Sequence, residues 1–169
     1  MKDRIGIFLI FASILIAFII GRYFTVLPGN VYFTPGPDCE NNIIREIERA
    51  QKIDIAVYSI TNQKIANSIF AAHKRGARIR IITDRTMAGG RYSVVADLEA
   101  GGIPLRRHRG HKIEHNKFAV FDNARIVTGS YNWTQGATKY NSENCIFLNI
   151  FGPKYSRRFE YLWGLYGGG

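Results

Sequence analysis

An imidazole and an ammonium group lie two residues apart in one extended stretch of this chain. His115 and Lys117 belong to the segment HNKFAVFD, which ends at Asp122. Side chains at positions i and i+2 of an extended run project from the same face. A single phosphate group could therefore contact both side chains.

A second polar pair with the same spacing follows this segment. Ser130 and Asn132 stand in the sequence GSYN, where Gly129 removes a side chain at a point that a ligand could approach closely. Glu143 opens the next strand-like run, where its carboxylate could accept a hydrogen bond from the imidazole, fix its tautomer and raise its basicity. Each piece alone is weak, because a lone histidine is more often a surface residue and Gly-Ser-x-Asn is often only a turn. Their common order and spacing predict a site.

The combined pattern resembles the active-site signature of the phospholipase D superfamily. H-x-K-x4-D is followed after six residues by G-S-x-N and then by a glutamate. The segment from His115 to Phe147 is similar to the small bacterial Nuc-type endonucleases and to the mitochondrial relatives that carry one such motif. More loosely, the order of elements upstream is similar too. His73, His108 and His111 do not fit the pattern, so the chain carries a single motif.

The resemblance implies a mixed β-sheet flanked by helices and a homodimer, in which two copies meet across a two-fold axis and build the active site together. It further implies that His115 attacks phosphorus and forms a phosphohistidine, while the partner's His115 protonates the leaving oxygen and later activates water. No metal ion and no other cofactor is expected.

The resemblance also assigns roles to the other matching residues. Lys117 and Asn132 would bind the non-bridging oxygens, and Ser130 would add a hydrogen bond. Glu143 would orient the imidazole. Two further signature residues are expected to be structural: Asp122 and Gly129.

The charge of the chain favours a partner that carries phosphate. Lysine and arginine number 23 against 13 acidic residues, a formal net charge of +10. This excess fits both nucleic acid and anionic lipid headgroups and does not choose between them. The densest basic stretch directly precedes the motif, where it is either a nucleic-acid contact or a solvated loop. Its candidate contacts are Arg106, Arg107, Arg109, His111 and Lys112.

The amino-terminal segment, residues 1–27, is predicted to be a membrane anchor. Residues 5–20 carry no charge, and Lys2 and Arg4 precede them. The apolar run is longer than a usual signal-peptide core and slightly short for a spanning helix, but no small-x-small cleavage site follows it. The basic residues would keep the amino terminus in the cytoplasm and place the domain on the periplasmic face of a bacterial membrane. Secretion after signal cleavage is the alternative.

Residues 28–169 are predicted to form one α/β domain. Strand-prone and helical runs alternate in its first part, in the order 31–34, 43–50, 53–60, 62–74, 77–83, 92–100 and 103–107. This alternation is typical of a mostly parallel sheet with helices on both faces. Residues 117–121 and 125–128 are close enough to form a hairpin, 143–150 add a strand, and a helix follows from residue 153.

Two cysteines and three aromatic residues complete the expectations. Cys39 and Cys145 form no zinc motif, and the sequence leaves open whether they pair. Trp133 is expected in the core, whereas Tyr131 and Tyr140 either stack on bases or pack in the core.

The sequence favours a metal-independent endonuclease acting on DNA or RNA, because the domain is basic and similar to Nuc-type nucleases. A phospholipase or cardiolipin hydrolase that uses the same site is the first alternative. A non-catalytic nucleic-acid-binding protein is the second. The preference for DNA or RNA, and for single strands or duplexes, stays open.

Overall fold

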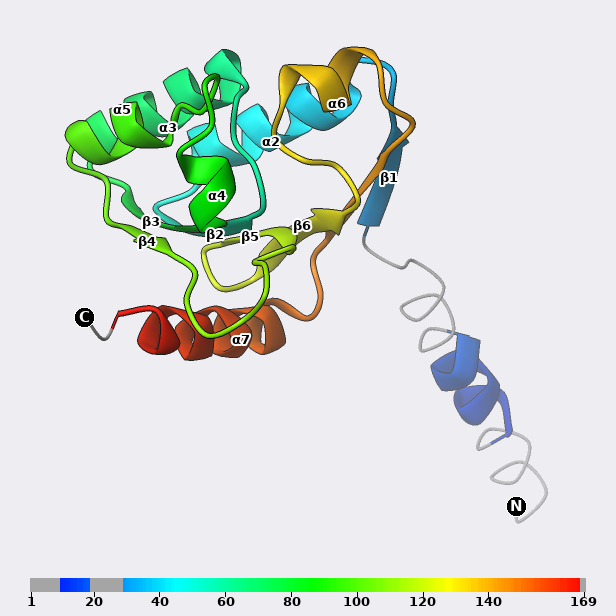
Figure 1. Ribbon diagram of the computed structural model, residues 1–169. Coiled ribbons are helices and arrows are strands. Elements are labelled where there is room, and N and C mark those ends of the chain that lie inside the picture. Colours follow the sequence, from blue (N-terminus) through cyan, green and yellow to red (C-terminus); the bar gives the residue numbers. More distant parts are fainter. Residues whose placement is uncertain (1–9, 19–28, 168–169) are drawn as a thin grey trace, which may run out of the picture.

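A seven-stranded sheet forms the middle layer of the domain, as Figure 1 shows. The computed structural model describes residues 10–18 and 29–167. The strands are β1 (Gly29–Phe33), β2 (Lys52–Val57), β3 (Arg78–Thr83), β4 (Leu105–Arg107), β5 (Lys117–Phe121), β6 (Arg125–Gly129) and β7 (Asn144–Leu148). They lie in the order β1-β7-β6-β5-β2-β3-β4.

The sheet is mixed, as predicted, but the expectation that it is mostly parallel is wrong. Only the pairs β2–β3 and β3–β4 are parallel, whereas β2–β5, β5–β6, β6–β7 and β1–β7 are antiparallel. Two parallel neighbours need a crossover connection between them. Here such connections join β2 to β3 and β3 to β4. β5 and β6 are joined by a tight turn in which Asp122 and Asn123 have positive φ angles of 52° and 57°. β1 lies at the far edge beside β7 instead of joining β2.

Helices cover both faces of the sheet (Figure 1). The upper face carries α2 (Asp38–Arg49), α3 (Gln63–Lys74), α4 (Arg85–Ala88), α5 (Val95–Ala100) and α6 (Gln135–Lys139), and the lower face carries α7 (Gly152–Leu165). Strand alternation divides the side chains of β5 between the two cores: Ala119 and Phe121 pack with the upper helices, and Phe118 and Val120 pack with α7. By the same alternation, Lys117 belongs to the upper face.

An ion-pair network holds α7 on the sheet. Arg80 donates from Nε to Asp54 Oδ1 at 2.8 Å and makes two further hydrogen bonds to Glu160 of α7. Its guanidinium lies 4.9 Å from the ring centroid of Phe159 and 5.2 Å from that of Trp163. The planar guanidinium thus joins two strands to the helix through charge and through ring contacts.

A disulfide joins the upper layer to the sheet. Cys39 of α2 and Cys145 of β7 are bonded, with their Cα atoms 5.9 Å apart. Both residues are buried. The pairing that the sequence left open is therefore present, and it spans 106 residues of chain.

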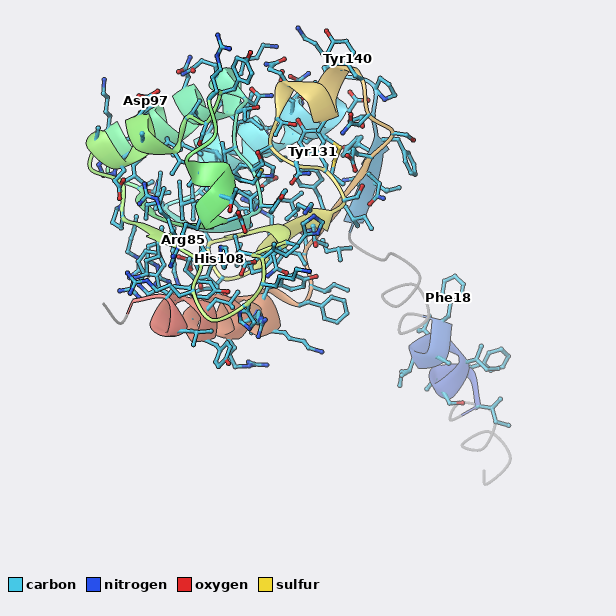
Figure 2. The ribbon with its side chains drawn as sticks, viewed as in Figure 1. Phe18, Arg85, Asp97, His108, Tyr131 and Tyr140 are labelled. Carbon is cyan, nitrogen blue, oxygen red and sulfur yellow. A yellow bond between two sulfur atoms is a disulfide. The ribbon has the colours of Figure 1, made fainter. Side chains whose placement is uncertain are left out.

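The expected anchor, residues 1–27, lies mostly outside the described residues. Residues 10–18 are helical and expose large apolar side chains, including Phe11 and the labelled Phe18 in Figure 2. Within the described part of the chain, no helix is long and apolar enough to cross a membrane.

Candidate active site

The segments of the signature meet at one end of the sheet. β5 begins at Lys117 where β6 ends at Gly129, because these neighbours are antiparallel, and β7 begins beside the same end of β6. His115, Ser130 and Glu143 each lie within two residues of one of these strand ends. Antiparallel pairing therefore collects residues that are up to 28 positions apart in the chain.

His115 is exposed and lies against Tyr58, a residue that the sequence did not single out. Their ring centroids are 4.7 Å apart, at an interplanar angle of 59°. Tyr58 directly follows β2, whose last residue pairs with Lys117, so its position at this end of the sheet follows from the strand register. The sequence signal that could have identified Tyr58 is its position directly after the apolar strand-like run IDIAV.

Lys117 is held between His115 and Tyr58. Its Nζ donates to the carbonyl oxygen of His115 at 2.8 Å and lies 4.9 Å from the ring centroid of Tyr58. Burial lowers the pKa of Lys117 below its usual range, although the charges of Glu143 and Glu114 act in the opposite direction. A phosphate in contact with this ammonium group would relieve the cost of its partial desolvation.

Ser130 and Asn132 lie on a loop that two aromatic residues anchor. Tyr131 and Trp133 alternate with them and are buried, so Trp133 is a core residue as predicted. Tyr131, labelled in Figure 2, contacts Thr138 Oγ1 through its hydroxyl at 2.6 Å. Burial raises the pKa of Tyr131 to about 12. Its burial excludes the alternative that it stacks on bases.

The two polar side chains of this loop differ in their contacts. Ser130 Oγ accepts a hydrogen bond from the backbone N–H of Asn144 at 3.1 Å. The side-chain oxygen of Asn132 is buried and has no hydrogen-bond partner among the described residues. A buried amide oxygen without a hydrogen bond lowers the stability of the fold, so a ligand that donates a hydrogen bond to Asn132 would gain binding free energy.

Gly129 is required by the fold and not by a ligand. Its φ is +150°, and a Cβ atom built there would lie 2.3 Å from the carbonyl oxygen of Asn144. The group that approaches Gly129 closely is therefore the backbone of β7. The contact at Gly129 is thus a structural one within the fold.

Glu143 does not contact the imidazole within this chain. Its Oε1 accepts a hydrogen bond from Asn141 Nδ2 at 3.0 Å, and no hydrogen bond joins its carboxylate to His115 among the described residues. Its charge nevertheless acts on Lys117. Glu143 thus lies at the site but does not orient His115 in the single chain.

Asp122 lies at the opposite end of β5 and makes only structural contacts among the described residues. Its Oδ1 accepts hydrogen bonds from the backbone N–H groups of Gln51 and Lys52, each at 2.9 Å. Its own N–H donates to the carbonyl oxygen of Lys52. Asp122 thereby joins the β5–β6 turn to the start of β2.

A buried carboxylate that the sequence did not reveal lies next to the histidine. Glu114 is 2% exposed and accepts hydrogen bonds from the hydroxyl of Tyr166 at 2.8 Å and from the amide group of Asn116. Its backbone N–H donates to Asp84 Oδ2 at 3.2 Å. Burial and the neighbouring Glu114 raise the pKa of Tyr166. The residues on both sides of His115 are therefore fixed.

Most of the basic run before the motif is engaged in the fold. Arg106 lies over the ring of Trp163 at 4.2 Å and donates to its carbonyl oxygen. Arg107 makes two hydrogen bonds to Glu99, which hold the pKa of Glu99 below its usual range. Both arginines thus make contacts that stabilise the fold, and these contacts already engage their guanidinium groups.

The rest of the run differs from residue to residue. His111 Nδ1 lies 2.8 Å from the hydroxyl of Tyr166. His108, beside Arg85 in Figure 2, is buried and accepts a hydrogen bond from the Arg85 N–H at 2.9 Å. Arg109 and Lys112 are exposed and remain candidates for contacts with phosphate.

Tyr140 was expected either to stack on bases or to pack in the core. Tyr140, at the outer rim of the domain in Figure 2, is 79% exposed and is not part of the core. Among residues 10–18 and 29–167, no group of three or more histidine, cysteine, aspartate or glutamate side chains could hold a metal ion.

Comparison with known proteins agrees with the geometry of the site. A profile of the family described as "Cardiolipin synthase, PLD-like domain" matches residues 43–163. A mitochondrial cardiolipin hydrolase of Xenopus tropicalis is 33% identical over 121 residues, covering 70% of this chain and 58% of that protein. A phospholipase D of Rickettsia prowazekii is 32% identical over 117 residues, covering 69% of this chain and 57% of that protein. The chain thus spans somewhat over half the length of these curated relatives.

Two solved structures share the fold over nearly their whole length. Nuc of Salmonella typhimurium, a phospholipase D family member, has a TM-score of 0.76 and 29% identity, covering 81% of this chain and 94% of that one. NucT of Helicobacter pylori has a TM-score of 0.76 and 23% identity, covering 80% and 95%, and shows the likeness of the fold. The chain belongs to the phospholipase D superfamily of phosphodiesterases, as a member of the Nuc type.

Proposed function

We propose that this protein is an endonuclease that hydrolyses nucleic-acid phosphodiester bonds at an active site shared by two copies of the chain. The observation that carries the proposal is the placement of His115 and Lys117 beside the loop of Ser130 and Asn132 at one end of the sheet. The exposed imidazole can attack an electrophilic phosphorus atom, and the partly desolvated ammonium group next to it can bind the anionic oxygens of the phosphate.

The need for a second copy follows from the number of available histidines. Hydrolysis through a covalent intermediate needs one group to attack phosphorus and another to protonate the leaving oxygen. His108 is buried beside Asp84, and His111 contacts Tyr166. An isologous dimer would bring the partner's His115 to the first and supply the missing acid.

The proposed reaction has two steps. A ring nitrogen of His115 attacks phosphorus, a P–N bond forms, and the P–O bond to the leaving group breaks as the partner's His115 donates a proton to that oxygen. The partner's histidine then takes a proton from water, whose oxygen attacks phosphorus and breaks the P–N bond. Lys117 and Asn132 bind the non-bridging oxygens in both steps, and Ser130 adds a hydrogen bond.

Nucleic acid is the favoured substrate for two reasons. The chain has a formal charge of +10, and its likeness to Nuc covers 94% of that structure at 29% identity. A nucleic acid gains affinity from each additional phosphate that contacts the protein, whereas a single lipid headgroup offers few such contacts. Cardiolipin or another phospholipid is the second candidate, because relatives at 32–33% identity are named for lipid hydrolysis.

The substrate is tested by offering the purified full chain single-stranded DNA, duplex DNA, RNA and cardiolipin vesicles, each in EDTA. We expect cleavage of nucleic acid by the wild type and none by His115→Ala, with His73→Ala as the matched control that keeps activity. Release of phosphatidic acid without cleavage of any nucleic acid would overturn the choice of substrate. Undiminished cleavage by His115→Ala would instead overturn the catalytic role of this residue.

We further propose that residues 1–27 anchor the domain of residues 28–169 to a membrane, outside the cytoplasm. The buried disulfide between Cys39 and Cys145 supports this location, because disulfides persist in oxidising compartments. The exposed apolar side chains of residues 10–18 are compatible with insertion into lipid. Protease added to spheroplasts should remove the domain, whereas protection that ends only on lysis of the spheroplasts would contradict this orientation.

A further inference from the structure

A cavity of about 480 Å³ lies on the lower face of the sheet, beside the strand that carries the catalytic residues. Its volume is within the range of roughly 300–1,000 Å³ that ligand sites occupy. Asn116, Phe118 and Thr128 line it from the sheet, and the first half of α7 lines it from below. None of the roles proposed above uses this cavity.

Two cationic side chains on α7 give the cavity its charge. Lys154 and Arg158 are one helical turn apart, both are exposed, and both line the cavity. No acidic residue is among those that line it. The guanidinium of Arg158 lies 5.2 Å from the ring centroid of Tyr161, a contact that leaves its charge in place. An occupant that carries a negative charge would be attracted by both cations.

Two aromatic residues give the cavity flat walls. Phe151 is 55% exposed and has a positive φ of 65°, and its carbonyl oxygen accepts hydrogen bonds from the N–H groups of Lys154 and Tyr155. This conformation is uncommon for a bulky residue, and here it presents a phenyl ring to solvent. Tyr155 packs edge-on against Phe118, with ring centroids 5.1 Å apart. Exposed rings of this kind are stacking platforms for unpaired bases.

The cavity and the proposed active site adjoin the same end of β5, on opposite faces of the sheet. Asn116 lines the cavity and stands between His115 and Lys117 in the sequence. Because neighbouring residues of a strand project to opposite faces, a ligand that reaches from the catalytic residues to the cavity must pass around the end of β5. A flexible polyanion can make this turn, whereas a stiff duplex cannot.

We propose that this cavity is a subsite for a nucleotide that flanks the scissile bond of a single-stranded nucleic acid. Lys154 and Arg158 bind its phosphate, and Phe151 stacks on its base. The proposal rests on the proposed function and deepens it, because it names single strands as the substrate class. A base can stack on Phe151 only when it is unstacked from its neighbours, which favours single strands over duplexes.

Binding tests the subsite separately from catalysis. The full-length His115→Asn chain is titrated with a fluorescent single-stranded oligonucleotide and with the matching duplex, and anisotropy gives Kd between 50 and 200 mM salt. In this background, Lys154→Gln with Arg158→Gln should weaken single-strand binding roughly three- to tenfold at 0.1 M salt. The slope of log Kd against log salt should fall by about 0.7, because the two side chains bind one phosphate.

A matched control lies on the same helix. Arg157 is exposed and lines a separate depression with Lys52 and Glu160. Arg157→Gln removes one positive charge, as does each of the substitutions Lys154→Gln and Arg158→Gln. Arg157→Gln should change Kd less than twofold. Phe151→Asn, which suits a positive φ, should weaken single-strand binding roughly fivefold or more and leave duplex binding unchanged.

Three results would overturn the subsite. The first is equal binding by the Lys154→Gln, Arg158→Gln chain and the Arg157→Gln chain. The second is that the Lys154→Gln, Arg158→Gln chain loses binding to cardiolipin vesicles while its oligonucleotide binding is unchanged. The third is that the same substitutions change the sedimentation coefficient of the chain, which would make this face an interface between copies. If the double variant fails to fold, each single substitution is measured instead. Retained salt-dependent binding by a wild-type chain that cleaves no nucleic acid would refute the proposed function and leave the subsite standing.

Discussion

The hydroxyl of Tyr166, directly after the C-terminal helix, donates a 2.8 Å hydrogen bond to the buried carboxylate of Glu114. Glu114 directly precedes His115, and its second oxygen accepts from the amide of Asn116. The end of α7 therefore fixes the backbone on both sides of the exposed histidine. Glu114 forms no ion pair within hydrogen-bonding distance among the described residues, so its buried carboxylate depends on such donors for its stability.

Tyr166→Phe removes this donor and keeps the ring. We expect a loss of about 1–3 kcal/mol in the free energy of unfolding, because one oxygen of Glu114 loses its partner. We also expect a lower kcat at nearly constant KM, since the position of His115 becomes less defined. Thermal unfolding and steady-state kinetics measure the two effects. Tyr161→Phe, at an exposed position of the same helix, should change neither.

The proposed sharing of one active site between two chains predicts how activity depends on the fraction of intact chains. Wild-type and His115→Asn chains are co-refolded at different ratios and assayed for cleavage. If each site needs two histidines, activity should fall with the square of the wild-type fraction, because only dimers of two wild-type chains are complete. A linear decline would show that one chain suffices and would contradict the shared site.

The lowered pKa of Lys117 predicts the alkaline side of the pH profile. Burial places this pKa below the usual value of 10.5, so the cation is lost earlier than in an exposed lysine as pH rises. The activity that depends on the cation should therefore be full below that pKa and decline as pH passes through it. Lys117→Arg stays charged and should extend kcat/KM to higher pH.

A bound phosphate stabilises the ammonium form of Lys117, so the alkaline limb of kcat should lie at higher pH than that of kcat/KM. Both limbs are read from rates measured between pH 7 and pH 11. Lys74→Arg, at the end of α3, provides the matched control and should leave the profile unchanged. An alkaline limb that does not move in Lys117→Arg would assign it to another group.

The close approach of β6 and β7 predicts the effect of a methyl group at Gly129. Gly129→Ala places a Cβ atom 2.3 Å from the carbonyl oxygen of Asn144, at a φ of +150°. We expect a loss of about 2–4 kcal/mol in stability, and displacement of Ser130 with a lower kcat. Urea unfolding measures the loss. Gly164→Ala, where a Cβ meets no atom within 4 Å, should instead stabilise the chain by about 0.5–1 kcal/mol.

The catalytic segments could be predicted from the sequence because their signals are local. The i, i+2 spacing of His115 and Lys117 and the short connection between β5 and β6 depend only on neighbouring residues. The alternation of strands and helices likewise revealed the α/β class. Tyr58 could have been found by asking which residue ends the strand that pairs with β5, but that pairing is itself a tertiary fact.

The identity and spacing of the residues that we propose to act on phosphate were determined by the sequence itself, because strand periodicity and turn geometry operate over a few residues. Only the tertiary structure decided the antiparallel neighbours of β5, the bond between Cys39 and Cys145, and the engagement of Arg106 and Arg107 within the fold. It also created the cavity beneath Asn116, by placing Lys154 and Arg158 of a distant helix against the strand. These features depend on contacts between segments far apart in the chain, and such contacts are set by how the layers pack and not by any local pattern.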